Sequence, residues 1–327
     1  MLLFLSIRTG LIFVVLCTGF LLPVQGAPGL SLESYLERLG YASIPLKRGD
    51  DNHLLASAEI NGKKSVLLVD SGWSLSTLDR RVAKRVKTLG DLGLTLEDSF
   101  LGRITNRSLG LVEHLKLGNA EFFNQPVQVS EIKIGGKRTE EDGALGCDFL
   151  FRNFCLLGCK QRQLYVRSSA VDPKISEAMK GTLQRAGFRE VPLHRTEGLV
   201  FTCDAVLQGQ PLKLIVDTGA VWSMLDERIQ RRISLYVQKV PAEIKGVGKR
   251  GTHALQKAEV KNLVVGGTVT LANVVFGVAP LDAWGVGRDD HAFLKDVDGF
   301  LGAEQLVFNE ALIDFHGATL WLRPSGK

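Results

Sequence analysis

Residues 60–79 read INGKKSVLLVDSGWSLSTLD, and residues 207–226 read LQGQPLKLIVDTGAVWSMLD, 147 positions further along a chain of 327 residues. In both stretches a Gly after a polar residue, an apolar run, an Asp, a small hydroxyl residue and a second Gly fall at the same positions. Self-similarity at a fixed spacing is the sequence signature of a repeated structural unit. The chain is therefore predicted to hold two copies of one fold.

A second pair of matches follows in each copy, in the same order. Ala144-Leu145-Gly146 recurs as Phe300-Leu301-Gly302, and Leu164-Tyr165-Val166 recurs as Leu320-Trp321-Leu322. The spacing of these matches is 156 residues, so the second copy carries a short insertion between its motifs. Two ordered matches in each half support duplication of a whole lobe rather than chance repetition of one motif.

The repeats set the expected domain boundaries. We place the first lobe at residues 46–168 and the second lobe at 191–327, which suits the usual domain size of about 100–200 residues. Residues 169–190 are predicted to be a helical connector, because Asp172 is a good N-cap and Pro173 suits the first helical position. Apolar residues then recur at helical spacing.

Within each copy the pattern favours β-structure. Val66-Leu67-Leu68-Val69 and Leu214-Ile215-Val216 are short apolar runs typical of strands buried on both faces. Asn61-Gly62 and Gln208-Gly209 lie between strand-like runs, and Asn-Gly is a strong hairpin signal. Further expected elements are a hairpin over residues 263–278 and short helices over 79–87 and 226–233. The sequence thus predicts an all-β protein with few helices.

Asp70 and Asp217 each end one of the apolar strands. Burial of a carboxylate is costly unless backbone N–H groups or hydroxyls donate to it. Gly72 and Gly219 let the chain turn sharply and bring such donors close. A single Asp of this kind would be interpreted as a turn former or a helix cap, but two of them in equivalent places favour a functional pair.

Duplicated units tend to pair about a two-fold axis, as homodimers do. On such an axis the two carboxylates would face each other, and Ser71 and Thr218 could form hydrogen bonds across the lobe junction. Two close carboxylates cannot both ionise easily, so the pair would share one proton. One could then take a proton from water while the other donates to the carbonyl under attack, which is general acid–base hydrolysis.

The triplets Asp70-Ser71-Gly72 and Asp217-Thr218-Gly219 resemble the signatures of aspartic peptidases. Ala144-Leu145-Gly146 and Phe300-Leu301-Gly302 resemble the apolar-apolar-Gly element beside each catalytic loop of that family. Because each copy is short, the whole is similar to two fused retropepsin-like domains. The resemblance implies a bilobal all-β fold with two β-barrel-like lobes related by a pseudo-two-fold axis, and an endopeptidase. It assigns catalysis to Asp70 and Asp217, and supporting roles to Ser71, Gly72, Thr218 and Gly219.

The resemblance also implies a flap in each lobe, a hairpin that closes over the substrate. The expected substrate-binding positions are Gly102 in the first lobe, and Gly246 and Gly248 in the second. Neither stretch contains the Tyr of pepsin-like flaps, which favours the retropepsin-like comparison.

Trp73 departs from the family pattern, which usually places Ala or Ser directly after the Gly. The indole either crowds the dyad, fills part of the cleft or packs on the core of its lobe. If it blocks the dyad, the chain is a peptide-binding protein that kept the fold without catalysis. A third class of function is an exported scaffold that uses its sheets to pair with partners.

Composition excludes several other classes. The formal charge of +5 is small and the basic residues are scattered without interleaved aromatic residues, so no nucleic-acid partner is expected. The six His residues form no paired ligand motif, and we expect neither a metal nor an organic cofactor. The expected partner is a peptide or protein substrate, bound by a monomer.

The cysteines beyond the N-terminal segment are Cys147, Cys155, Cys159 and Cys203. An even number permits disulfides in an exported chain without requiring them. Cys155 and Cys159 are expected in one strand, too far apart to bridge unless the strand bends. Buried thiols are the alternative.

The N-terminal segment has the pattern of a signal peptide. Arg8 precedes an apolar run from Leu11 to Leu22, Pro23 ends the run, and small residues lead to Gly26. We expect cleavage after Gly26, a signal peptide at residues 1–26, a lead-in at 27–45, and export to the periplasm or the medium. An uncleaved anchor is the alternative, and no other segment is expected to span a membrane.

Overall fold

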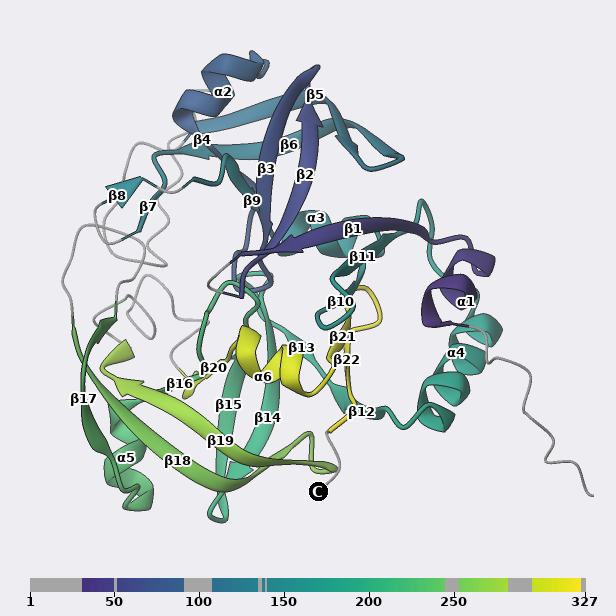
Figure 1. The fold of residues 1–327 in the computed structure, drawn as a ribbon. Coiled ribbons are helices and arrows are strands. Elements are labelled where there is room, and N and C mark those ends of the chain that lie inside the picture. The colour runs from purple at the N-terminus through teal and green to yellow at the C-terminus, as the bar shows by residue number, and fades with distance from the viewer. Residues whose placement is uncertain are drawn as a thin grey trace, which may run out of the picture.

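The computed structural model describes residues 31–49, 52–90, 108–134, 137–138, 140–244, 253–281 and 296–324. The predicted signal peptide and the predicted flap positions Gly102, Gly246 and Gly248 lie outside these residues. The fold is all-β with two similar lobes, as the sequence predicted. In Figure 1 the first lobe lies at the top and the second at the bottom.

Six strands form a closed ring in the first lobe. Each pairs with the next, and the last, β5, returns to the first, β2. The parallel neighbours β3 and β9 bring the end of the first apolar run beside the Leu145-Gly146 element. In ring order the strands are β2 (Leu54–Ile60), β3 (Lys63–Val69), β9 (Gly143–Leu145), β4 (Thr77–Asp79), β6 (Ala120–Ser130) and β5 (Ser108–Leu117).

The second lobe repeats this ring in the same order. Its last strand, β18, returns to β14, and β15 and β20 are the corresponding parallel neighbours. Strand β17 (Gln238–Ile244) adds to β18, and β13 (His194–Arg195) adds to β14. The ring consists of β14 (Phe201–Leu207), β15 (Gln210–Val216), β20 (Gly299–Leu301), β16 (Met224–Asp226), β19 (Val269–Ala279) and β18 (His253–Val265).

The hairpins follow from local chemistry. Asn61 and Gly62, which join β2 to β3, have φ values of 47° and 76°, and Gln208 and Gly209 have 50° and 79°. Two consecutive residues with positive φ are what a tight hairpin needs, because this turn matches the twist of the strands. These two hairpins and the predicted one over residues 263–278 are confirmed.

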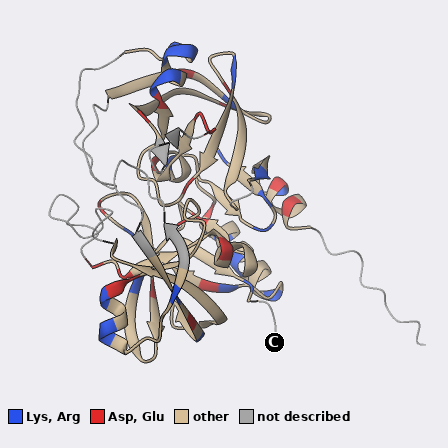
Figure 2. Ribbon diagram, turned by 60° about the vertical axis from the view of Figure 1, so that its left-hand side comes forward, with Lys and Arg blue, Asp and Glu red and all other residues tan. Residues whose placement is uncertain are grey.

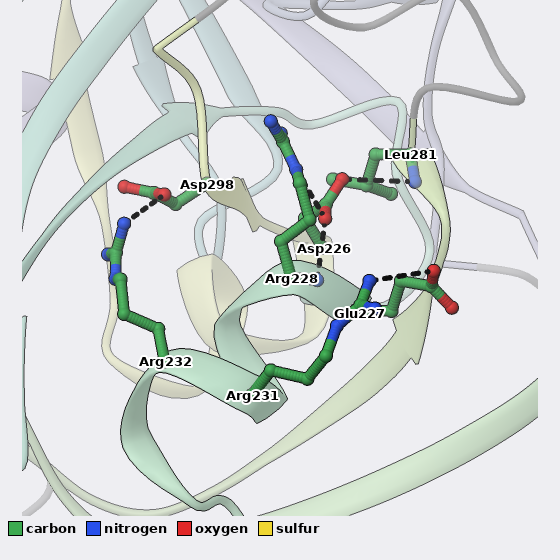
Figure 3. A network of polar contacts seen from close by, with 7 residues as sticks. All are labelled: Asp226, Glu227, Arg228, Arg231, Arg232, Leu281 and Asp298. Carbon is green, nitrogen blue, oxygen red and sulfur yellow. Dashed lines mark hydrogen bonds and ion pairs between the residues drawn. The ribbon is translucent and has the colours of Figure 1, made fainter.

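Both predicted short helices are present, as α2 (Arg80–Val86) and α5 (Glu227–Ile233). A polar network ties α5 to the ring (Figure 3). Asp226 caps the helix by accepting from the Arg228 N–H at 2.8 Å, pairs with the Arg228 guanidinium, and accepts from the Leu281 N–H at 3.2 Å. Arg232 reaches Asp298, just before β20, at 3.3 Å.

The first lobe has the same network at equivalent positions. Asp79 accepts from the N–H groups of Arg81 and Ile132 at 2.9 and 3.2 Å, and Arg85 pairs with Asp142 at 3.1 Å. The basic residues of α2 and α5 lie at the outer ends of the two lobes (Figure 2). The duplication therefore extends from the sequence motif to its polar contacts.

The sheet of the first ring continues from β2 into β1, the first of six strands that join the lobes at their base and form the base sheet. At its centre β10 pairs antiparallel with β21, its counterpart in the second copy, with Leu157 opposite Ile313. When equivalent strands of two copies pair antiparallel with equivalent residues opposite each other, a pseudo-two-fold axis passes between the strands. The strands run in the order β12 (Arg189–Pro192), β22 (Thr319–Leu322), β21 (Leu312–Asp314), β10 (Leu156–Gly158), β11 (Gln163–Val166) and β1 (Ala42–Arg48).

Two helices cover this base sheet. The predicted connector helix is α4 (Pro173–Arg185), capped by Asp172. Helix α1 (Leu32–Arg38) lies in the predicted lead-in, and both helices pack around buried Tyr165 and Trp321. Strand β1 begins before residue 46, where we placed the start of the first lobe, and ends after it. The domain boundaries themselves stay predictions.

The remaining described elements are short: α3 (Cys147–Arg152), α6 (Ala303–Phe308), β7 (Lys133–Ile134) and β8 (Lys137–Arg138). All four described cysteines are buried free thiols, and Cys155 and Cys159 flank β10 rather than bridging. Among the described residues, no helix combines the length and apolar character that a membrane span requires.

Candidate active site

Two loops, one from each lobe, meet at the lobe junction. Asp70 follows β3, and its N–H donates to the Leu145 carbonyl at 3.1 Å. Asp217 follows β15, and its N–H donates to the Leu301 carbonyl at 3.0 Å. The Leu-Gly elements found in the sequence therefore pack directly beside the two Asp loops.

The loops are interlocked by reciprocal hydrogen bonds. The Thr218 hydroxyl accepts from the Ser71 N–H at 3.0 Å and donates to the Val69 carbonyl at 2.9 Å. The Ser71 hydroxyl accepts from the Thr218 N–H at 3.0 Å and donates to the Val216 carbonyl at 2.7 Å. Both side chains are fully buried. This is the cross-junction pairing that the sequence predicted, and it fixes one loop relative to the other.

The interlock brings each carboxylate over the glycine of the opposite loop. A Cβ on Gly72 would lie 2.4 Å from Cγ of Asp217, and a Cβ on Gly219 would lie 2.2 Å from Oδ2 of Asp70. No side chain fits at such distances, so glycine is required at both positions because of close approach. Asp70 and Asp217 also contact each other through their side chains.

Backbone donors hold each carboxylate in place. Oδ1 of Asp70 accepts from the Gly72 N–H at 2.8 Å. Oδ1 of Asp217 accepts from the N–H groups of Gly219 and Ala220 at 2.8 and 3.0 Å. These are the donors that burial of a carboxylate requires, and the sharp turns at the glycines supply them.

The electrostatics of the pair favour one retained proton. Burial raises the pKa of Asp70 above the usual carboxyl range, although the backbone N–H groups oppose the shift. Burial raises the pKa of Asp217 as well, and the negative charge of Asp70 adds to that shift. Two such groups in contact can act as one acid and one base.

Trp73 is anchored within the first lobe. Its indole N–H donates to the Thr77 hydroxyl of β4 at 2.9 Å, and its carbonyl accepts from the Cys147 N–H at 2.8 Å. Trp73 is partly exposed. Of the three positions considered for the indole, these contacts match packing on its own lobe.

Ser76, which lies 147 positions before Ser223 in the repeated stretch, reinforces the first loop. Its hydroxyl accepts from the Gly146 N–H at 3.0 Å and donates to Asp148 at 2.7 Å. In the second lobe the Ser223 hydroxyl accepts from the Gly302 N–H at 2.9 Å, and Glu304 accepts from the Ser223 N–H at 2.9 Å. The segment after each Asp is therefore tied to the neighbouring Leu-Gly element.

Two contacts at the loops were not predicted from the sequence. The Cys147 thiol donates to the Ser71 carbonyl at 3.1 Å, and burial raises the pKa of this thiol well above its usual range. His53 is buried, and its Nε2 lies 2.8 Å from the Gly219 carbonyl oxygen. In the sequence His53 is one of several dispersed histidines, and no motif marks it.

Within the part of the chain that the structure describes, no three His, Cys, Asp or Glu side chains gather into a metal site. The arrangement that the structure does show is a buried carboxylate pair on two locked loops. Such a pair can exchange protons with a molecule bound between the lobes.

Comparisons with known proteins found one matching family model and similar solved structures. A family model described as "Aspartyl protease" matches residues 56–149 and 203–304, and the two ranges contain both Asp loops. A solved aspartic proteinase from Irpex lacteus is 11% identical, with a TM-score of 0.47, and the match covers 88% of this chain and 98% of that chain. A retropepsin-like aspartic protease from Rickettsia conorii is 20% identical, with a TM-score of 0.28, over 38% of this chain and 89% of that chain. A search of curated proteins found no match.

Proposed function

The chain belongs to the aspartyl protease family, and from that premise we propose that it is an endopeptidase in which Asp70 and Asp217 activate a water molecule. One observation carries the proposal. Each carboxylate lies over the glycine of the opposite loop, so close that a Cβ could not fit. Two separate acidic turns would not produce this reciprocal contact.

The proposed reaction needs one proton on the pair. The ionised carboxylate takes a proton from water, whose oxygen attacks the carbonyl carbon of the peptide bond. The protonated carboxyl group donates its proton to the carbonyl oxygen, which gives a neutral tetrahedral intermediate. A proton then passes to the amide nitrogen, the C–N bond breaks, and an acid and an amine leave. This shared-proton scheme is the known pattern of the aspartic-protease dyad and is carried over from the family.

The retained proton has a chemical consequence. If both carboxyl groups ionise, the acid is lost, and if both are protonated, the base is lost. We therefore propose a bell-shaped pH dependence, and its place on the acid side of neutrality is carried over from the family. The substrate class is an extended peptide or an unfolded protein segment that lies across the lobe junction.

We also propose that the protein acts after export, once residues 1–26 are removed. The support is the sequence pattern of that segment, with one basic residue, an apolar run and small residues before the cleavage point. N-terminal sequencing of the exported protein would check it, since a mature chain that starts at Ala27 is expected.

The test of the function is cleavage by the mature chain. We expect hydrolysis of a denatured protein between pH 3 and 7, inhibition by a pepstatin-type peptide, and loss of cleavage in both Asp70→Asn and Asp217→Asn. Cleavage that survives both substitutions would contradict the mechanism. Binding of the same peptides without cleavage at any pH would instead support the peptide-binding rival.

A further inference from the structure

A buried histidine of the first lobe contacts the Asp loop of the second lobe. His53 lies between β1 and β2, is 6% exposed, and places Nε2 2.8 Å from the carbonyl oxygen of Gly219. Because a carbonyl oxygen only accepts, Nε2 must carry the proton and donate. Both the neutral tautomer with its proton on Nε2 and the imidazolium ion can make this bond.

The accepting carbonyl shares a peptide unit with a donor to the dyad. The C=O of Gly219 and the N–H of Ala220 belong to one planar group, so fixing the oxygen also fixes the direction of the N–H. That N–H donates to Oδ1 of Asp217 at 3.0 Å. A hydrogen bond to the carbonyl also polarises the peptide and strengthens its N–H as a donor. His53 therefore orients and strengthens a bond to Asp217 without touching the carboxylate.

The pseudo-symmetric position in the second lobe has no such donor. The Gly49 N–H donates to the His53 carbonyl at 2.9 Å, and at the equivalent positions of the second lobe the Thr196 N–H donates to the Val200 carbonyl at 2.9 Å. Even the positive φ values correspond, at 66° for Asn52 and 69° for Leu199. Val200 is fully buried and its side chain is purely apolar. The Gly219 carbonyl thus receives a side-chain donor from the first lobe, whereas the side chain of Val200 can offer none to the opposite loop.

We propose that His53 is a positioning residue for the peptidase reaction, which holds the Gly219–Ala220 peptide so that the Ala220 N–H stays directed at Asp217. The inference rests on the proposed function for its kinetic consequence. Its structural consequence, the orientation of the Ala220 amide, does not depend on catalysis and can be measured separately.

The kinetic test compares three substitutions of His53 in the mature chain. His53→Leu keeps apolar bulk but has no donor, His53→Ala removes both, and His53→Gln keeps an N–H donor. Loss of one oriented hydrogen bond should lower kcat about tenfold, since tenfold corresponds to about 1.4 kcal/mol. We expect this fall in His53→Leu and His53→Ala with KM changed less than about twofold, and recovery of most of kcat in His53→Gln. Val200→Ala is the matched control and should leave kcat within about twofold.

The structural test follows the Ala220 amide by NMR in the protein without substrate. An amide proton that donates to a carboxylate resonates downfield, so the signal should move upfield in His53→Leu and return in His53→Gln. Unchanged kcat and an unchanged Ala220 signal in His53→Leu would overturn the inference. So would equal losses in His53→Leu and His53→Gln, because the donor would then not matter.

These readouts separate the two proposals. If the wild-type chain cleaves nothing, the proposed function fails. The Ala220 signal then decides the positioning role alone, and its failure to respond to His53→Leu overturns that role too. If the wild type cleaves peptides, and His53→Leu keeps both the wild-type kcat and the wild-type Ala220 signal, the function stands and the positioning role is wrong.

Discussion

Removal of the Ser71 hydroxyl should weaken the junction between the lobes. Ser71→Ala takes away the acceptor of the Thr218 N–H and the donor to the Val216 carbonyl, at 3.0 and 2.7 Å. Ser71 and Thr218 are both buried, so water cannot replace these partners. A buried group left without its hydrogen bond costs about 1–3 kcal/mol. Two such losses, partly relieved by relaxation, should lower the free energy of unfolding by about 2–4 kcal/mol.

The assay is equilibrium unfolding in urea at 25 °C, followed by circular dichroism. Ser43→Ala is the matched control, because its partly exposed hydroxyl contacts only side chains, Glu33 and Gln163. That control should cost about 0.5 kcal/mol or less. The dependence of the unfolding free energy on urea concentration should have the same slope in wild type and variants, because each exposes the same surface on unfolding.

The reciprocal hydrogen bonds also predict how the effects of two substitutions combine. Thr218→Ala removes the matching bonds to the Ser71 N–H and the Val69 carbonyl. Once one half of the interlock is lost, the other half is free to loosen, so the double variant should lose less than the sum of the single variants, by about 0.5–3 kcal/mol. If Ser71→Ala costs no more than Ser43→Ala, or if the two losses simply add, the interlock does not hold the lobes as described.

Three further predictions follow from the same site. Gly219→Ala should abolish cleavage and lower Tm, because its Cβ would lie 2.2 Å from the opposite carboxylate, whereas Gly181→Ala in helix α4 should raise stability by up to about 1 kcal/mol. The pKa of Asp217 is raised in the folded state, so this carboxyl group binds its proton more strongly there than in the unfolded state, where its pKa is about 3.9. The stability of the wild type should therefore fall as the pH rises from about 4 through the raised pKa. Asp217→Asn should gain stability relative to wild type over that interval, by about 1.4 kcal/mol for each pH unit between the unfolded and folded pKa values, and an equal pH slope in urea unfolding of the two proteins would contradict this. Trp73→Ala should keep kcat within about tenfold, since the indole is bonded to its own lobe; a variant that cleaves peptides when wild type does not would show that the indole blocks the dyad.

The local elements could be predicted from the sequence because each has a short-range cause. Asn61-Gly62 supplies the positive φ values of a tight hairpin. Asp79 and Asp226 cap helices that begin at the next residue. The repeat then indicated that two such units exist, and that Asp70 and Asp217 occupy equivalent places.

Only the tertiary structure decided how the two units meet. The contacts that build the site join residues far apart in the chain, such as Ser71 with Thr218 and His53 with Gly219. No periodicity links His53 to Gly219, because the repeat places Val200, not a second His, at the equivalent position. Sequence patterns report the faces that an element buries, whereas a contact across the pseudo-two-fold axis depends on the packing of both lobes on the shared base sheet. That packing sets which donor each carboxylate meets, and it became visible only in three dimensions.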